Sequence, residues 1–386
     1  MSEAEQVVRR LLGHLEKRIN LDHVSQAAAR QKAALDYCEL DRLPITFYLP
    51  YEGSDFTPYP YSEAFADPAK MMVNELLIGF TSIYHAVDLR DDAPYCLRPN
   101  LGTGLIASMF GAEIRLMEDN PPWVVPVGGL ERIRALVEGP LPDVYAGLGR
   151  RVIDQYAYFH ELLAQFPLCY EAFQLTLPDL QGPFSTAELL WGPQIYLALY
   201  DYPELVCGLL ERITTQIIRV HHTLARLTRD TLGPGYCYQH AVATKGYLLV
   251  RNDSMVNLSP KHYRDIVLPY DARLSAELGG IGVHFCGKGM HQVDNLLRIR
   301  GLSCLDLGDP EMNALDELYA QVAPRQVALV RLTVPDGQLH AATLRKRFPT
   351  GVILVHKSQS VAQAQSLLER YLHGLHVMFS DANRAE

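Results

Sequence analysis

The residues best suited to chemistry are His284 and Cys286, in the segment from Gly280 to Met290. An apolar run able to form a buried strand leads into them, and glycines that allow a tight turn follow. Side chains two positions apart on a strand point the same way, so an imidazole and a thiol would project together from the strand end. Both are zinc ligands, although two ligands alone do not hold zinc. The alternative is a packing role for the thiol and a hydrogen-bonded loop role for the imidazole.

Other polar side chains also follow apolar runs that could form strands. Taken singly, each could cap a helix or fix a turn. Taken together, they fall at the carboxyl ends of strands, where α/β barrels keep their catalytic groups. These pairs are Asp179 and Gln181, Asn252 and Asp253, Asp306 and Asp309, and His356 and Lys357.

The elements that must position these residues are strands and helices in alternation. From Leu43 onward we count about eight strand candidates separated by helical patterns, including a weak one at 111–116 and one at 170–178. Repeated βα units predict a closed (β/α)8 barrel or an open doubly wound sheet. No complete dinucleotide fingerprint follows the first strand, and Gly102-Thr-Gly104 lacks the third glycine. We therefore predict an α/β fold with a (β/α)8 TIM barrel.

Residues 1–40 precede the barrel pattern. Apolar side chains recur there at helical spacing between charged ones, which indicates one or two amphipathic helices. We expect an N-terminal helical extension over 1–40 and the barrel over 41–386. The extension either covers the barrel floor or makes a subunit contact, and the sequence favours neither role.

Composition narrows the classes of partner. The chain has 386 residues, of which 48% are hydrophobic, and a formal net charge of -9. Nucleic-acid binding needs clustered Lys and Arg, and the sequence has no basic stripe with interleaved aromatic residues. No apolar run reaches the roughly 18 residues that span a bilayer, and the amino terminus lacks a signal-peptide layout, so we expect a cytoplasmic protein without a membrane partner. The seven cysteines include no CxxC pair, which suits reduced thiols.

Six short motifs follow one another along the chain: Asp179-Leu-Gln-Gly-Pro183, Asn252-Asp-Ser254, Leu258-Ser-Pro260, Pro269-Tyr270, His284-Phe-Cys-Gly287 and Pro349-Thr-Gly-Val-Ile353. In content and order they resemble the uroporphyrinogen decarboxylase superfamily, over roughly residues 40 to 375. The resemblance implies a (β/α)8 barrel. It also implies one of two activities, because the superfamily includes porphyrinogen decarboxylases and zinc-dependent methyltransferases that act on methylated corrinoid proteins or on thiols such as coenzyme M.

The decarboxylase branch fits this sequence less well than the methyltransferase branch. True decarboxylases resemble one another in an early arginine-rich segment, whose guanidinium groups bind substrate carboxylates bidentately. The corresponding segment here, Pro44 to Pro50, has no arginine. A divergent porphyrinogen decarboxylase is therefore kept only as an alternative.

The resemblance to the methyltransferase branch carries its His-x-Cys zinc ligands onto His284 and Cys286. In that branch, zinc lowers the pKa of the acceptor thiol and presents a thiolate to the methyl donor. A later cysteine is also a ligand there, but no cysteine follows Cys304 here. Glu311 and His356 are chemically able substitutes. The site then holds zinc through a remodelled ligand set, holds a different metal, or holds none.

We therefore expect a metal-assisted methyltransferase that moves a methyl group between a corrinoid or other donor and a thiol, with zinc as cofactor and the corrinoid as co-substrate. The alternative from another class is a tetrapyrrole- or corrinoid-binding protein without catalysis. The expected partners are a small thiol, a tetrapyrrole or corrinoid, a corrinoid protein, and a second copy of the chain in a homodimer. The expected catalytic residues are Asp179 and Asp253, and the expected substrate-binding residues are Gln181, Asn252, Asp309 and Lys357.

Overall fold

The centre of the fold is a six-stranded sheet in which all neighbouring strands run parallel. The computed structural model describes residues 1–117 and 120–382. Almost all strand residues are buried, which explains why these segments read as continuous apolar runs. In spatial order the strands are β1 (Ile45–Tyr48), β12 (Val352–Lys357), β11 (Ala328–Leu332), β10 (Leu302–Leu307), β9 (Ile281–Phe285) and β8 (Leu248–Arg251).

Two further parallel strands, β2 (Tyr95–Leu97) and β5 (Phe173–Leu175), pair with each other beside this sheet. Hydrogen bonds of the segments that flank these two strands connect the pair to the sheet on either side. Asp92 N donates to a backbone oxygen of β1 over 2.8 Å, and Gly182 N donates to one of β8 over 2.7 Å. Regular ladder pairing is interrupted at these two places, which we call the β1/β2 seam and the β5/β8 seam. The architecture is a mixed α/β fold around a central parallel sheet, consistent with the predicted barrel-like arrangement.

Two buried aspartates close the β1/β2 seam. Phe47 N donates to Asp91 Oδ2 over 2.5 Å, and Ile45 N donates to Asp92 Oδ2 over 2.9 Å. The carboxylates thus accept N–H groups that a neighbouring strand would otherwise pair. Arg42 forms an ion pair with Asp92 and supplies a compensating charge. Burial raises the pKa of Asp91 to about 7.

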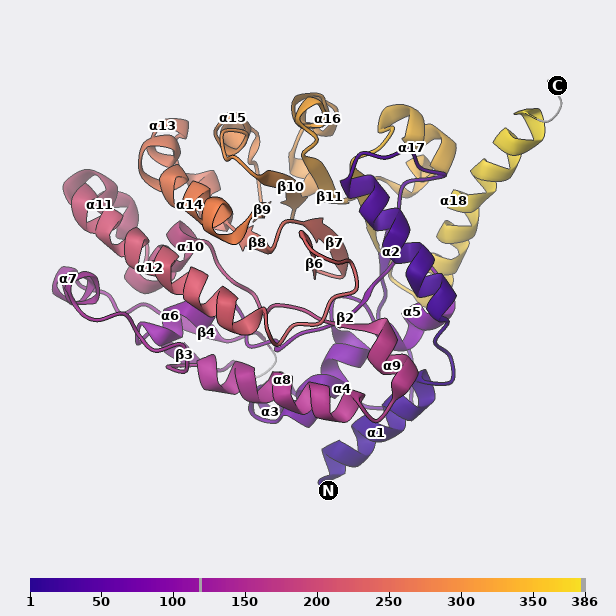
Figure 1. Cartoon of the computed structure of the whole chain (residues 1–386), viewed down its shortest axis with the longest axis horizontal. Helices are drawn as coiled ribbons and strands as arrows, with labels where there is room; N and C mark the ends of the chain where they lie inside the picture. The colour runs from indigo at the N-terminus through magenta and orange to yellow at the C-terminus, as the bar shows by residue number, and fades with distance from the viewer. Residues whose placement is uncertain (118–119, 383–386) are drawn as a thin grey trace.

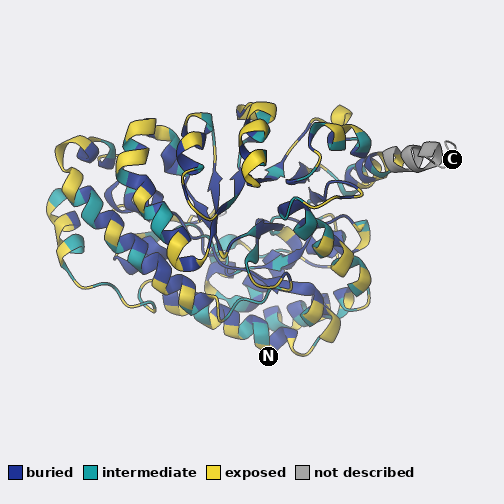
Figure 2. Cartoon of the chain, turned by 45° about the horizontal axis from the view of Figure 1, so that its top comes forward, coloured by how far each residue is buried: buried dark blue, intermediate teal, exposed yellow. Residues whose placement is uncertain are grey.

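Helices surround the strands (Figure 1). The strands are buried and the outward faces of the helices are exposed, so the longer helices whose burial is described pack their apolar stripes inward (Figure 2). After the two amino-terminal helices, they are α3 (Tyr61–Ala66), α4 (Pro68–Ile78), α5 (Ile83–Leu89), α6 (Leu105–Met109), α7 (Leu130–Glu138), α8 (Gly149–Leu163), α9 (Pro167–Ala172), α10 (Pro183–Trp191), α11 (Ile195–Asp201), α12 (Pro203–Leu224), α13 (Pro260–His262), α14 (Leu268–Leu278), α15 (Val293–Leu296), α16 (Leu315–Val322), α17 (Ala341–Arg347) and α18 (Val361–Ala382).

The amino-terminal segment forms two helices, α1 (Glu3–Leu15) and α2 (Leu21–Leu35), which confirms the predicted amphipathic pattern. The side chains of Ser2 and Asn20 accept backbone N–H groups of the first turns and cap the two helices. Both helices contribute to the same hydrophobic core as the strands. Within the described ranges, no helix has the length and apolar character needed to cross a bilayer.

Two segments differ from the predicted alternation. The weak strand expected at 111–116 is β3 (Glu113–Arg115), which pairs antiparallel with β4 (Trp123–Val125) and lies outside the central sheet. The strand expected at 170–178 is shorter, because its first residues belong to α9, which begins with a proline in its first turn.

A second antiparallel hairpin, β6 (Tyr236–Gln239) and β7 (Val242–Lys245), packs between α2 and strands β9 to β11 (Figure 1). Its turn residues, His240 and Ala241, have φ angles of 49° and 53°. Positive φ at both positions is typical of a type I′ turn, which usually contains Asn and Gly. The hairpin brings His240 to the carboxyl ends of the central strands.

Candidate metal centre

Neighbouring parallel strands place charged side chains side by side at their carboxyl ends. Arg251 of β8 is in register with His284 of β9, which is in register with Asp306 of β10. Arg331 of β11 follows the residue in register with Asp306. All four side chains are buried or nearly so. This row explains why polar residues at strand ends, far apart in the sequence, form one cluster.

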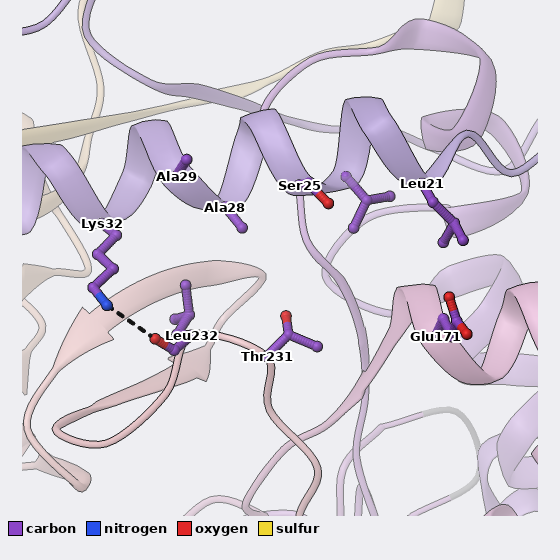
Figure 3. Close-up of a pocket in the computed structure, with 9 residues that line it drawn as sticks. Leu21, Ser25, Ala28, Ala29, Lys32, Glu171, Thr231 and Leu232 are labelled. Carbon is purple, nitrogen blue, oxygen red and sulfur yellow. Dashed lines mark hydrogen bonds between the residues drawn. The ribbon is translucent and has the colours of Figure 1, made fainter.

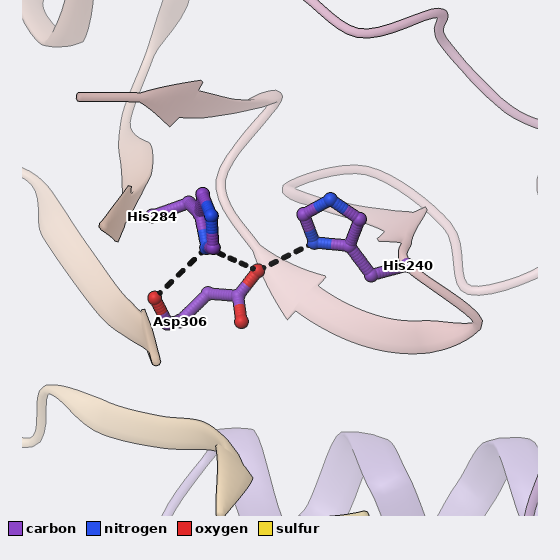
Figure 4. A group of neighbouring side chains, drawn as sticks. All are labelled: His240, His284 and Asp306. Atoms are coloured by element: carbon purple, nitrogen blue, oxygen red, sulfur yellow. Dashed lines mark hydrogen bonds and ion pairs between the residues drawn. The ribbon is translucent and has the colours of Figure 1, made fainter. Parts of the chain in front are cut away.

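His284 belongs to two groups of potential metal ligands. We call His240, His284 and Asp306 the buried group, and Asp253, His284 and Cys286 the thiol group. Within each group, one ligand atom from each residue lies within 4.8 Å of the others. Figure 4 shows the buried group, in which one carboxylate oxygen of Asp306 lies between the two imidazoles.

The buried group forms a hydrogen-bonded chain. His240 Nδ1 is 2.6 Å from Asp306 Oδ2, and Arg251 Nη2 is 2.6 Å from His240 Nε2. Because a guanidinium can only donate, His240 Nε2 accepts and Nδ1 carries the proton. Burial and the charge of Arg251 lower the pKa of His240 well below its ordinary value. His240 is therefore a neutral link between Arg251 and Asp306.

Asp306 also orients His284. Two oxygens of Asp306, the backbone oxygen and Oδ2, lie 3.1 and 3.3 Å from His284 Nδ1, and Arg331 Nη2 is 3.2 Å away. We assign the proton of Nδ1 to the two oxygens, which leaves a lone pair on Nε2. Burial opposes ionisation of Asp306, but Arg331 and the imidazoles hold its pKa well below its ordinary value. The carboxylate is thus ionised and paired.

The thiol group lies on the other side of His284. Cys286 Sγ is 3.5 Å from His284 Nε2, and Asp253 Oδ1 is 3.4 Å from the same nitrogen. Cys286 is exposed as a residue, yet partial burial of its thiol and the charge of Asp253 raise the pKa of Cys286 to about 12. Without an added cation the sulfur is therefore a protonated thiol at neutral pH.

The loop that carries Cys286 is held by two predicted site residues. Cys286 N donates to Asp253 Oδ1 over 2.9 Å, and Gly287 N donates to Asp309 Oδ2 over 2.8 Å. Asn313 Nδ2 donates to Gly287 O over 3.0 Å. Asp309 therefore positions the backbone beside the thiol group.

His356, also predicted near a strand end, has partners outside the two groups. His356 Nε2 is 2.8 Å from Asp336 Oδ1, and His356 Nδ1 is 3.1 Å from Ser358 Oγ. Glu311 and Lys357 are exposed. Among the described residues, neither group of potential ligands includes Glu311 or His356. The structure instead brings Asp253, predicted as a catalytic residue, to His284 and Cys286.

Asp179 and Gln181 reach the centre through Arg251. Asp179 Oδ1 is 2.7 Å from Arg98 Nη1 and 2.5 Å from Arg251 Nη2. Burial opposes its ionisation, but the two arginines lower the pKa of Asp179 below its ordinary value. Buried Gln181 forms an isolated backbone bridge with Arg251. A carboxylate held ionised in this way is a counter-ion rather than a proton donor.

Asn252 connects the strand end to the helical layer. Its Nδ2 donates to Asp271 Oδ2 over 2.6 Å, and Tyr263 Oη donates to the same oxygen over 2.7 Å. Burial raises the pKa of Asp271 to about 7. The Asn252 side chain thus makes a buried contact with α14.

Sequence patterns did not point to His240, Arg98, Arg251 or Arg331 as site residues. Arg251 is the last residue of β8 and Arg331 the penultimate residue of β11, and these positions were the available signal. His240 lies in a turn without apolar periodicity or an Asn-Gly pair, so no local pattern indicates it.

A separate cavity of about 350 Å³ lies between α2, Glu171 of α9 and the loop at 231–232 (Figure 3). Small side chains of α2 form one wall, and Lys32 Nζ donates to Leu232 O over 3.3 Å. The cavity includes no member of the buried or thiol groups, so it is not part of the candidate metal centre.

Comparisons with known proteins bear on the fold. No family model matches the sequence, and no curated protein matches it. The structure resembles that of a methyltransferase from Methanosarcina mazei, with a TM-score of 0.62 and 13% sequence identity, over 92% of this chain and 99% of that chain. At this identity the two chains share a fold.

Proposed function

We propose that this chain is a metal-assisted methyltransferase on a closed (β/α)8 barrel of the uroporphyrinogen decarboxylase superfamily, with a thiol as methyl acceptor. The observation that carries the proposal is the convergence of a carboxylate and a thiol on His284 Nε2 at the strand ends. These three ligand types fit zinc, and exposed Cys286 leaves one side of the group open to a substrate. The solved structure of like fold is itself a methyltransferase, which supports the proposal.

The residues of this chain would prepare the site as follows. Asp306 fixes the ring of His284 so that Nε2 faces the thiol group. Asp253 and Asp309 hold the backbone of Cys286 and Gly287. Zinc held by Asp253, His284 and Cys286 would lower the pKa of the acceptor thiol. It would thus favour the thiolate form of the acceptor, which is the nucleophile in methyl transfer. We propose a corrinoid, free or carried by a corrinoid protein, as the methyl donor.

The use of the arginines favours this function over porphyrinogen decarboxylation. Arg98, Arg251 and Arg331 reach the strand ends, although the early segment lacks arginine. Asp179 and Asp306 already pair with them. A substrate with several carboxylates would have to compete with these buried partners.

The test is elemental analysis of protein purified without chelator or affinity metal, combined with a methyl-transfer assay from methylcobalamin to a panel of thiols. We expect about one zinc per chain in the wild type, retained in Cys38→Ser, an exposed thiol outside both groups. Cys286→Ser should lose the zinc and at least about 100-fold in transfer rate, or about 2.7 kcal/mol of barrier.

Two results would contradict the proposal. Transfer that is equally fast in wild type and Cys286→Ser would remove the thiol group from the reaction. Corrinoid binding without transfer to any thiol would instead support a non-catalytic binding protein.

A further inference from the structure

Asn252 lies at a junction between the candidate metal centre and the helices around it. It directly precedes Asp253, a member of the thiol group, and its backbone N–H donates to His284 O over 2.8 Å. Asn252 is only 1% exposed, so its side chain belongs to the interior. A displacement of Asn252 would therefore disturb two members of the thiol group, Asp253 through the chain and His284 through this hydrogen bond.

Two residues of one helix hold the Asn252 side chain. Asn252 Nδ2 donates to Asp271 Oδ2 over 2.6 Å, and Tyr263 Oη donates to the same oxygen over 2.7 Å. Tyr263 and Asp271 are both fully buried. Because no water competes for a hydrogen bond in such surroundings, Tyr263 fixes the carboxyl group and the carboxyl group fixes the amide.

A π-helical turn brings Tyr263 and Asp271 to the same side of their helix. The turn, Tyr263–Val267, continues α13 into α14, and Leu268 N donates to Tyr263 O across it. Residues eight positions apart fall out of phase in a regular α-helix, because two turns cover about 7.2 residues. The extra residue of a π-turn lengthens two turns to about eight residues, so both side chains can reach one point.

Sequence features on both sides of Asn252 favour this arrangement. Pro269 follows the π-turn, and in a regular α-helix its ring would clash with the carbonyl group four residues earlier, a clash that a wider turn relieves. Gly182 leaves room for the amide, because a β-carbon at this position would lie 2.1 Å from Asn252 Oδ1. Both residues belong to short motifs that the proposed chemistry does not otherwise use.

We propose that Asp271 and Tyr263 are positioning residues of the candidate metal centre. They hold Asn252, and through it they hold the Asp253 carboxylate beside the other two members of the thiol group. The inference deepens the proposed function and rests on it for the role of zinc. The geometry itself is present without a metal, so it can be tested separately.

The test follows one backbone amide in metal-free protein labelled with ¹⁵N-cysteine. Cys286 N donates to Asp253 Oδ1, so its hydrogen exchange reports whether the carboxylate is in place. Asp271→Leu removes the acceptor for the Asn252 amide, and exchange of Cys286 N measured by NMR should become at least about tenfold faster. The amide of Cys304, buried in β10, should not change, whereas a general loss of stability would accelerate it as well.

Three further variants separate the acceptor from its surroundings. Asp271→Asn keeps an oxygen that can accept both hydrogen bonds, so exchange should stay within about threefold of the wild type. Asp265→Asn, an exposed position in the π-turn, should leave exchange unchanged. Gly182→Ala displaces the Asn252 amide and leaves Asp271 in place, so it should also accelerate Cys286 exchange, and it serves as the test if Asp271→Leu does not fold.

Unchanged Cys286 exchange in Asp271→Leu or in Gly182→Ala, or equal acceleration of Cys286 and Cys304, would overturn the inference. Where zinc binds, Asp271→Leu should weaken its affinity by about 10–100-fold, the range for residues that support a ligand, and an unchanged affinity would also count against it. A wild type that binds no zinc would contradict the proposed function, while the exchange rates would still decide whether Asp271 positions Asp253.

Discussion

The buried group and the thiol group share His284 but balance their charges differently. In the buried group, Asp306 is paired with Arg331 and hydrogen-bonded to His240, so its charge is compensated by the protein. In the thiol group, the ion-pair partner of Asp253 in the described part of the chain is His284 alone, and Cys286 is a protonated thiol. In the buried group, a divalent cation would compete with Arg331 for Asp306. In the thiol group, the same cation would supply the positive charge that Asp253 and Cys286 lack. The difference teaches that geometry alone does not choose between two ligand sets, whereas charge balance does.

Asp306→Asn is the strongest way to test the buried half of this comparison. We expect the free energy of unfolding to fall by about 3–5 kcal/mol, because Arg331 would be left as an uncompensated buried charge. Urea titration followed by circular dichroism, without added metal, measures this change. Asp316→Asn removes an exposed ion pair with Arg347 and should lower the free energy of unfolding by less than about 1 kcal/mol. Equal losses in the two variants would contradict the distinction.

Asp253→Asn tests the other half. We expect zinc affinity to fall at least 100-fold, beyond the roughly 10–100-fold typical of residues that only support a ligand. Stability without metal should change by less than about 1 kcal/mol, because Asn still accepts from Cys286 N and the position is partly exposed. Competition with a chromophoric chelator gives the affinity. Asp309→Asn, which contacts the same loop outside the group, is the matched control.

The pH dependence of metal binding sharpens the comparison further. The pKa of Cys286 is raised to about 12, so the free protein holds a thiol that must lose its proton when a metal binds. Raising the pH lowers the cost of this proton loss, so zinc affinity should increase by about tenfold per pH unit between pH 7 and 9. Any weak zinc binding that remains in Cys286→Ser at high metal concentration should lack this slope. A wild-type affinity that does not change with pH would mean that Cys286 is not a ligand.

His240→Asn tests whether the buried group supports the thiol group. Asn tolerates positive φ, so the turn should form, but the link between Arg251 and Asp306 would be lost. We expect zinc affinity to fall by about tenfold, the lower end for a supporting residue. Unchanged affinity would show that the two groups act independently despite sharing His284.

The smallest expected effect is at the neighbouring turn position. Ala241 has a positive φ of 53°, which an L side chain rarely adopts. Ala241→Gly should relieve this strain and raise the free energy of unfolding by about 0.5–1 kcal/mol, with zinc affinity unchanged. Thermal and urea unfolding would measure the gain. A loss of stability would imply that the packing energy of the Ala241 methyl group exceeds the strain energy of the backbone.

The strands and the position of His284, Cys286 and Asp253 could be predicted because parallel strands bring their carboxyl ends to one edge. Apolar runs marked the strands, and the polar residues after them marked the edge. Spacing along one strand also predicted correctly that His284 and Cys286 approach each other.

The position of Asp253 at the strand ends was predicted, but its approach to His284 and Cys286 could not be, because spacing does not reveal which way a loop side chain points. His356 lies near the carboxyl end of β12, as Asp253 lies just after β8, yet the His356 imidazole bonds to Asp336 and Ser358. His240 was beyond prediction for another reason: it arrives on a hairpin held by tertiary contacts, not by a local turn signal.

Gln31 of α2 gives the amino-terminal helices a further significance. Its side chain accepts from Ala243 N of the hairpin and donates to Asp92 O at the β1/β2 seam. Selection on the candidate metal centre would therefore extend to a helix that contributes no ligand. During evolution, the first 40 residues could not be exchanged freely between homologues, because the replacement for α2 would have to fit the hairpin that presents His240.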